Sequence, residues 1–145
     1  MRTPASIAGH PMHPMLITLP VGLFIFSLLC DLVAVLSAAP ATWHTVAFYT
    51  MVGGFVGALI AAMPGFADFL SITDERVRRI AIMHMALNLI VVTLYGVNIW
   101  LRVDGDDSGT PLLLSLLAVA LLGASGWLGG SMVYRHGVGV NAEPR

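Results

Sequence analysis

The sequence predicts an all-α integral membrane protein in which one domain of four transmembrane helices forms an antiparallel bundle. Of the 145 residues, 57% are hydrophobic and only 10% are charged, whereas a soluble domain carries about 25% charged residues. Four long apolar runs follow one another along the chain, at residues 15–39, 45–70, 80–101 and 111–134. Because the connections between these runs are short, consecutive helices should be antiparallel neighbours.

Each apolar run is long enough to cross a bilayer on its own. A helix needs about 20 apolar residues to span roughly 30 Å of hydrocarbon, and a buried helix of a soluble protein is usually shorter and more amphipathic. The first run also exceeds the apolar part of a cleavable signal peptide, so we expect it to remain as a helix. Pro20 and Pro64 should kink or loosen the first two helices.

Three polar segments separate the runs, at residues 40–44, 71–79 and 102–110. The last of them contains DGDDSG, which is typical of a solvated turn. In the second, the sequence from Thr73 to Glu75 predicts the N-cap and the acidic first turn of the third helix.

Small residues at intervals of four occur in two of the runs. They are Gly53, Gly57, Ala61 and Gly65 in the second run, and Gly126 and Gly130 in the fourth. Small side chains let membrane helices approach closely. We therefore expect both rows to mark contacts between helices rather than contacts with a cofactor.

The arginines predict the orientation of the chain in the membrane. Six of them lie on one side of a four-span topology, and only Arg102 lies on the other. The six are Arg2, Arg76, Arg78, Arg79, Arg135 and Arg145. Because cytoplasmic loops are rich in positive residues, both termini and the 71–79 connection should be cytoplasmic. Trp43 and Trp100 would then lie at the outer interface and Tyr134 at the inner one.

Four of the five histidines, together with one carboxylate, should gather on the cytoplasmic side of the bundle. They are His10, His13, His84, His136 and Asp68. Imidazoles with a carboxylate suit a haem or a transition metal, so these residues are candidate metal ligands. The alternative is that the loop histidines bond headgroups or water at the interface. His84, inside its span, could equally be a structural histidine paired with Asp68 or Asn88.

Polar groups near the outer side form a thinner layer around Asp31. A carboxylate at this depth should face the bundle and have a partner, for which Tyr95 or Asn98 is the expected donor. Asp31 is either structural or part of a proton relay. We group four further residues with it as buried polar residues of the bundle that share this structural or relay role, namely Asn88, Tyr95, Asn98 and Arg135. His44 is expected at the interface, and Cys30, the only cysteine, is expected to be a small buried apolar residue.

The start GHPMHPMLITLPVGLFIFSLLCDL, the end LGGSMVYRHGVGV, and the internal stretches PGFADFL and MHMALN carry a family resemblance. The chain resembles a bacterial family of predicted four-helix inner-membrane proteins catalogued as a domain of unknown function. The resemblance implies an association with Rieske-type iron–sulfur modules in some relatives, although this chain has no cysteine set for such a cluster. The family's marks fall here on His10, His13, Asp31, Asp68, His84, Asn88, Arg135 and His136.

The best functional hypothesis is a redox-associated membrane module that binds haem b or a divalent transition metal on the cytoplasmic side. His13 and His84 are the first candidate ligands, with Asp68 and His136 as further ligands or supporting residues. One alternative is a small proton-coupled transporter titrating at Asp31 and Asp68, which would have to form a homo-oligomer.

The other alternative is a non-catalytic membrane anchor or subunit for a partner protein, whereas a redox partner protein belongs to the first hypothesis. The sequence has no basic patch for nucleic acid. It also has no nucleophilic triad, phosphate-binding loop or dinucleotide fingerprint, so we do not expect an enzyme.

Overall fold

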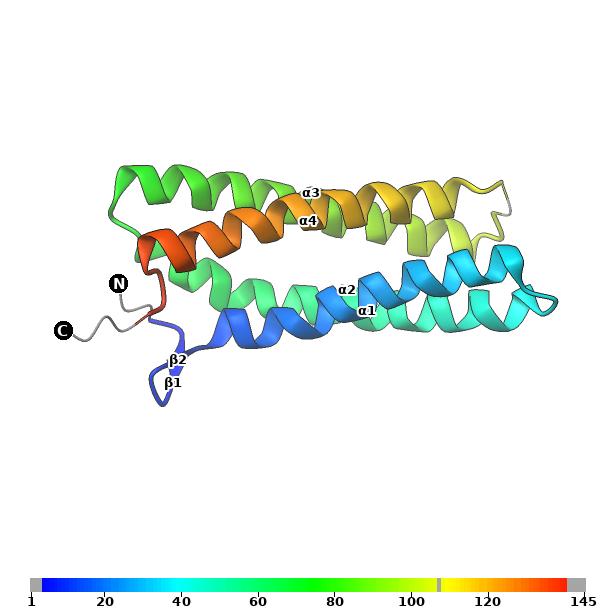
Figure 1. The fold of residues 1–145 in the computed structure, drawn as a ribbon, viewed down its shortest axis with the longest axis horizontal. Helices are drawn as coiled ribbons and strands as arrows, with labels where there is room; N and C mark the ends of the chain where they lie inside the picture. The colour runs from blue at the N-terminus through cyan, green and yellow to red at the C-terminus, as the bar shows by residue number, and fades with distance from the viewer. Residues whose placement is uncertain (1–3, 107, 141–145) are drawn as a thin grey trace.

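Four long helices lie side by side and run alternately in opposite directions in the computed structural model of the chain (Figure 1). The structure describes residues 4–106 and 108–140, so Arg2, Asp107 and Arg145 lie outside the described residues. Within that part the helices are α1 (Met12–Leu36), α2 (Pro40–Leu70), α3 (Glu75–Val103) and α4 (Thr110–His136). The predicted all-α antiparallel bundle is confirmed.

The helices extend beyond the apolar runs at several of their ends. Helix α1 begins at Met12 rather than near residue 15, and α2 begins at Pro40, where a proline at the first helical position is favourable. Helix α3 begins at Glu75 because Asp74 caps it, accepting the backbone N–H groups of Arg76 and Val77 at 2.8 and 3.1 Å. These hydrogen bonds hold the pKa of the exposed Asp74 carboxyl below its usual value. At α3, the capping residue rather than hydropathy therefore marks where the helix begins.

A short β-hairpin precedes α1 and was not predicted. Strand β1 (Ser6–Ile7) pairs antiparallel with β2 (His10–Pro11). The two residues between the strands, Ala8 and Gly9, both have positive φ angles, of 51° and 80°, as tight hairpin turns require. The hairpin places His10 in strand β2, whereas His13 lies in helix α1.

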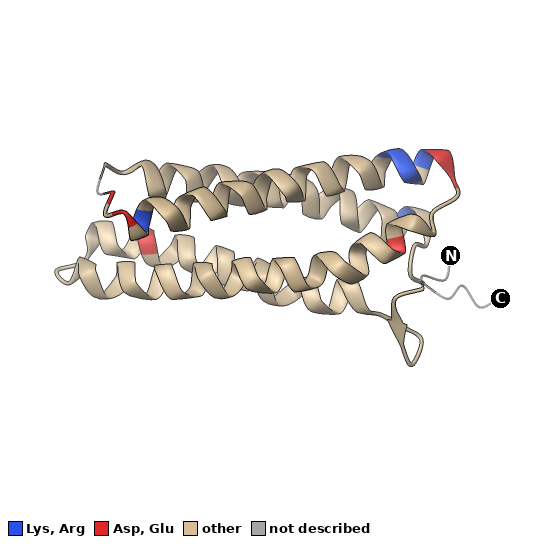
Figure 2. Cartoon of the chain, turned by 180° about the vertical axis from the view of Figure 1, so that it is seen from behind, with Lys and Arg blue, Asp and Glu red and all other residues tan. Residues whose placement is uncertain are grey.

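The exterior of the bundle is apolar and its interior contains polar side chains. All four helices are long and apolar enough to cross a membrane. Large apolar residues such as Leu19, Leu89 and Leu113 are more than half exposed, whereas Ser27 and Asn98 are fully buried. Charged residues gather near the two ends of the bundle and leave its middle free (Figure 2). This distribution matches a lipid-facing surface, where a soluble protein would expose polar groups.

Helices α1 and α2 form one closely packed hairpin, and α3 and α4 form another. The row of small residues on α2 faces α1, as expected. A Cβ atom at Gly57 would lie 3.5 Å from the ring of Pro20, and one at Gly53 would lie 3.4 Å from Leu23. The row on α4 makes no such contact within the chain, because no described residue lies within 4 Å of a Cβ atom built at Gly126. The face of α4 that carries Gly126 points away from the other three helices.

Gly54 tests how tightly the first hairpin is packed. A Cβ atom there would lie 2.8 Å from two ring carbons of Phe24, a buried residue whose ring stacks on Tyr95. We expect Gly54→Ala to lower the free energy of unfolding by about 1–3 kcal/mol, because the ring cannot move aside. The measurement is loss of helical circular dichroism on titration of detergent micelles with dodecyl sulfate. Gly53→Ala, which meets only the flexible end of Leu23, is the control and should behave as the parent protein.

Helices α1 and α3 run in the same direction and meet through side chains in the centre of the bundle. Three pairs connect them: His13 with His84, Phe24 with Tyr95, and Asp31 with Arg102. The members of each pair are 71 residues apart in the sequence, so the two helices keep one register along the bundle. The first and second pairs are separated by roughly 16 Å, and the second and third by roughly 10 Å, at 1.5 Å per residue.

Candidate functional site

His13 lies in the first turn of α1 and is fixed by α2. Its Nδ1 atom is 2.8 Å from the carbonyl oxygen of Ala61. Gly65, one turn further along α2, packs against the ring, and a Cβ atom there would lie only 2.6 Å from Nδ1. The small-residue row of α2 therefore supplies both the acceptor and the space for this imidazole.

His84 is held in the same way by the second hairpin. Its Nδ1 atom is 2.9 Å from the carbonyl oxygen of Ser125 on α4, and the Ser125 hydroxyl is also 2.9 Å away. Gly129, one turn further along α4, packs against the ring. A Cβ atom built at Gly129 would lie 3.2 Å from Cε1 of His84. Asn88 donates its side-chain amide to Nε2 at 3.0 Å. The predicted pairing of His84 with Asn88 is therefore present, but pairing with Asp68 is not.

These contacts determine which ring nitrogen carries the proton. A carbonyl oxygen only accepts hydrogen bonds, so Nδ1 of both His13 and His84 must be the protonated nitrogen in the neutral ring. Each Nε2 atom then carries a lone pair, and Asn88 donates to that of His84. An Nδ1–H group bonded to a backbone carbonyl is the arrangement that orients metal-binding histidines and raises their basicity.

The two imidazoles come from different hairpins and meet in the centre of the bundle. Their ring centres are 6.2 Å apart and their planes are nearly perpendicular, at 87°. His84 lies roughly 14 Å along α3 from Glu75, at 1.5 Å per residue. We call the end of the bundle where α1 begins and α4 ends the terminal end. The histidine pair lies inside the bundle, nearer to this end than to the other.

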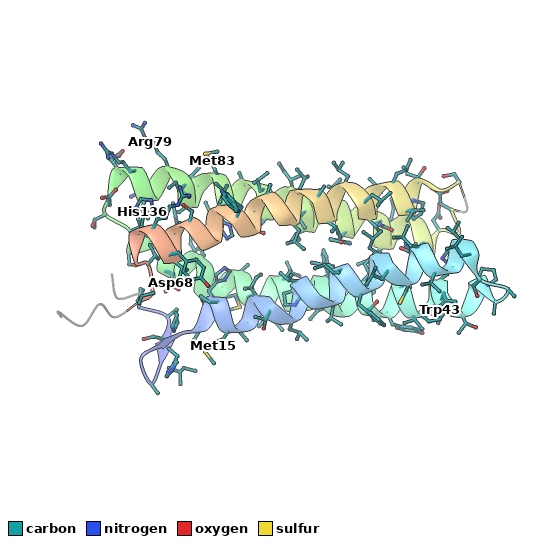
Figure 3. All side chains as sticks on the ribbon, in the orientation of Figure 1. Met15, Trp43, Asp68, Arg79, Met83 and His136 are labelled. Atoms are coloured by element: carbon teal, nitrogen blue, oxygen red, sulfur yellow. The ribbon has the colours of Figure 1, made fainter. Side chains whose placement is uncertain are left out.

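The remaining candidate ligands do not join this pair. His10 is exposed and bonds the carbonyl oxygen of Ala8 in its own hairpin. Asp68 accepts the backbone N–H of Ala5 at 3.0 Å, which ties the N-terminal segment to the end of α2. His136 is exposed in the last turn of α4. Figure 3 labels Asp68 and His136 at the terminal end. Across residues 4–106 and 108–140, no three His, Cys, Asp or Glu side chains form a group that could hold a metal ion.

A second polar cluster lies at the opposite end, around Asp31. Arg102 binds both carboxylate oxygens of Asp31, at 3.0 and 2.6 Å, and its Nε donates to Asn98 at 2.8 Å. Asn98 in turn donates to the Pro111 carbonyl and to the Ser115 hydroxyl. The cluster links α1, α3 and α4, and Asp31 is only 2% exposed.

The expected partner of Asp31 was wrong. Asn98 does not bond Asp31 directly but positions Arg102, and the Tyr95 hydroxyl is buried with no hydrogen-bond partner among the described residues. His44, placed at the interface from sequence, is half exposed yet lies 3.4 Å from Asp31. Arg135, grouped with the interior polar residues from sequence, is exposed. Cys30 is buried as predicted.

Sequence reasoning named Asn88 beside His84 and Asn98 near Asp31, but it missed Arg102 and Ser125 as supporting residues. Arg102 was placed on the outer side, at the start of the polar 102–110 segment. The constant separation of 71 residues that relates His13 to His84 also relates Asp31 to Arg102, and it was the one available signal. Ser125 acts mainly through its backbone carbonyl, for which the sequence offers no signal.

One protein-family model matches most of the chain. A family model described as a predicted membrane protein, DUF2231, matches residues 9–142, which include all four helices and both members of the histidine pair. No curated protein and no solved structure gives a significant match. The chain therefore belongs to the DUF2231 family of predicted membrane proteins.

Proposed function

We propose that this protein is a redox-associated membrane module in which His13 and His84 bind one haem iron between the two hairpins. The observation that carries the proposal is the pair of carbonyl-bonded imidazoles at 6.2 Å in the bundle centre. The imidazoles of His13 and His84 would be the two protein ligands that hold the haem iron. A bound haem would supply one-electron transfer, as in other histidine-ligated haem proteins.

The spacing of the imidazoles supports a shared metal. With a metal–nitrogen bond of ~2.0–2.1 Å and about 1.1 Å from a ring nitrogen to the ring centre, the centres of two imidazoles bound to one metal can lie up to about 6.5 Å apart. The observed separation of 6.2 Å falls in this range. Direct edge-to-face contact between aromatic rings also occurs at up to about 7 Å, so a binding measurement must separate the two interpretations.

The supporting residues fit the chemistry of the proposed ligands. The carbonyls of Ala61 and Ser125 keep Nδ1 protonated and leave Nε2 as the coordinating atom. Binding through Nε2 of His84 requires the Asn88 amide to leave that nitrogen. Asn88→Leu should therefore permit iron binding, whereas loss of either imidazole should prevent it.

We also propose that the terminal end of the bundle faces the cytoplasm of a bacterial cell. Arg76, Arg78, Arg79 and Arg135 lie at this end, as the positive-inside rule expects for cytoplasmic segments. At the opposite end, Arg102 is neutralised by Asp31. His13 and His84 would then hold the cofactor near the cytoplasmic face, where a redox partner protein such as a Rieske-type module could dock.

The test is an absorption spectrum of detergent-purified protein, expressed with haem supply or reconstituted with haem b. We expect the sharp Soret and α bands of a six-coordinate, low-spin haem at one equivalent per chain. His84→Ala and His13→Ala should each abolish the low-spin spectrum. His136→Ala and His10→Ala, which change exposed histidines, are matched controls that should retain it.

Two results would contradict the proposal. One is a protein that stays free of low-spin haem after reconstitution while remaining folded. The other is haem binding that survives both His13→Ala and His84→Ala. Elemental analysis of the same samples distinguishes a haem from a bare transition-metal ion, which would give metal without a Soret band.

A further inference from the structure

The outer face of α4 carries a groove that the proposed function does not use. It is open to the surface and has a volume of about 420 Å³. Gly126 and Gly130 leave it open along the helix, because they have no side chains to fill it. Trp127 and Tyr134, both largely exposed, border it, and Ser131 and Arg135 line it near the terminal end.

The polarity of the groove changes along its length. Toward the middle of the bundle it is lined by glycine and by the Trp127 indole. Toward the terminal end it is lined by two hydroxyls, of Ser131 and Tyr134, and by the Arg135 guanidinium. Arg135 forms no ion pair with any residue of the described part of the chain. The distance from Gly126 to Arg135 is roughly 14 Å at 1.5 Å per residue, which is about the hydrocarbon depth of one leaflet.

We propose that this groove is a binding site for an anionic phospholipid of the surrounding bilayer. The phosphate would lie at Arg135 with the hydroxyls of Ser131 and Tyr134 as donors, because a guanidinium pairs well with phosphate oxygens. One acyl chain would lie along Gly126 and Gly130 against Trp127. The order of polar and apolar lining along α4 matches the order of head and tail in a lipid at this leaflet.

A second copy of the chain is the main competing occupant, because glycines four residues apart often mediate helix dimers. Two copies related by an axis along the membrane normal would bring both Arg135 side chains to the same depth at the same contact. Like charges oppose such a dimer, whereas an anionic headgroup satisfies Arg135.

Quenching of Trp127 by brominated lipids tests the site. The chain has three tryptophans, so Trp43→Phe with Trp100→Phe leaves Trp127 as the reporter. The double variant is placed in phosphatidylcholine vesicles that contain brominated phosphatidylglycerol or brominated phosphatidylcholine with the same acyl chains. We expect phosphatidylglycerol to bind about fivefold better, which corresponds to the contribution of one arginine at an anionic lipid surface.

Three further variants, each made in this background, identify the groove. Arg135→Gln should bring the relative binding constant of the two lipids to about one. Gly126→Leu should displace the lipid by filling the groove, since a Cβ atom there meets nothing within 4 Å and the fold has room for it. Gly22→Leu is the matched control, because its Cβ atom is equally unobstructed on α1, and it should leave the preference intact.

Each contrary outcome overturns the proposal. Equal quenching by the two lipids in the parent would show no anionic site, and a preference that survives Arg135→Gln would place the site elsewhere. Chemical cross-linking of the same samples tests whether a second copy of the chain occupies the groove instead. If the parent cross-links as a dimer and Gly126→Leu as a monomer, a second copy fills the groove. None of these results depends on haem.

Discussion

Replacing Arg102 with methionine is expected to lower the free energy of unfolding by about 3–5 kcal/mol, the typical cost of breaking a buried ion pair by removing one partner. Asp31 is 2% exposed, and both of its oxygens are bound by the Arg102 guanidinium. Without Arg102, the remaining side chain beside the carboxylate is the half-exposed His44, whose Nδ1 atom lies 3.4 Å from Oδ1 of Asp31. Titration of micelles with dodecyl sulfate, followed by helical circular dichroism, measures the loss.

Two companion variants separate the charge from the shape of the side chain. Arg102→Lys keeps the charge but loses the paired hydrogen bonds to the carboxylate and the bond to Asn98, so its stability should lie between the parent and Arg102→Met. Combining Asp31→Leu with Arg102→Met removes both charges and should recover much of the loss. If the double variant is no more stable than Arg102→Met, the ion pair is not what stabilises this end of the bundle.

The ion pair also bears on the alternative of proton-coupled transport. A carboxylate that titrates during transport must exchange protons with water, whereas Asp31 is buried and bound by a guanidinium. The contacts of Asp68 are equally structural, because its carboxylate accepts the backbone N–H of Ala5. These contacts favour a structural role for both acidic residues.

The fold was predictable because a bilayer restricts the choices. Four apolar spans with short connections leave an antiparallel bundle as the simple solution, and the low content of charged residues excludes a soluble surface. The β-hairpin at Ser6–Pro11 was not predictable in the same way. Its turn at Ala8 and Gly9 depends on two positive φ angles, and only the glycine hints at them in the sequence.

The candidate site was predictable in part. Depth along the helices identified His13 and His84 as residues on one side of the membrane, and the structure brings their rings together. Depth alone could not exclude His10 or His136, because hairpin geometry and helix ends decide whether those side chains point inward. The register between α1 and α3 could not be predicted from the sequence either, because it depends on the packing of two helices that are not consecutive in the chain. That register is why Arg102 reaches Asp31.

The histidine pair and the Asp31–Arg102 ion pair both join α1 to α3, near opposite ends of the two helices. Between them, Phe24 and Tyr95 stack with their ring planes 3° apart and their centres 3.8 Å apart. All three contacts join α1 to α3 and therefore join the two hairpins. Changes at the Arg102 end should accordingly loosen the spacing of the imidazoles, because the same two helices carry both.

Gly65→Ala is expected to weaken haem binding by about 10–100-fold, the usual effect of disturbing a residue that orients a metal ligand. A Cβ atom at Gly65 would lie 2.6 Å from Nδ1, 2.9 Å from Cε1 and 3.1 Å from Cγ of His13. The ring would have to leave its position, and its hydrogen bond to the Ala61 carbonyl would be lost. The measurement is haem dissociation into an excess of a competing apoprotein that captures haem.

Alanine substitutions at two other glycines should weaken haem binding less, so that the three variants form a graded series. Gly129→Ala brings a Cβ atom to 3.2 Å from His84, so a small shift of the ring should accommodate it and the loss of affinity should be smaller. Gly57→Ala meets Pro20 at an ordinary 3.5 Å and should have no effect on haem binding. The same order should appear in the stability of the haem-free protein, with Gly65→Ala lowest by about 1–3 kcal/mol. If that order appears without any haem binding, the packing of the imidazoles is correct and the cofactor proposal fails. Equal stability and equal affinity across the series would instead mean that the two hairpins do not hold the imidazoles at these glycines.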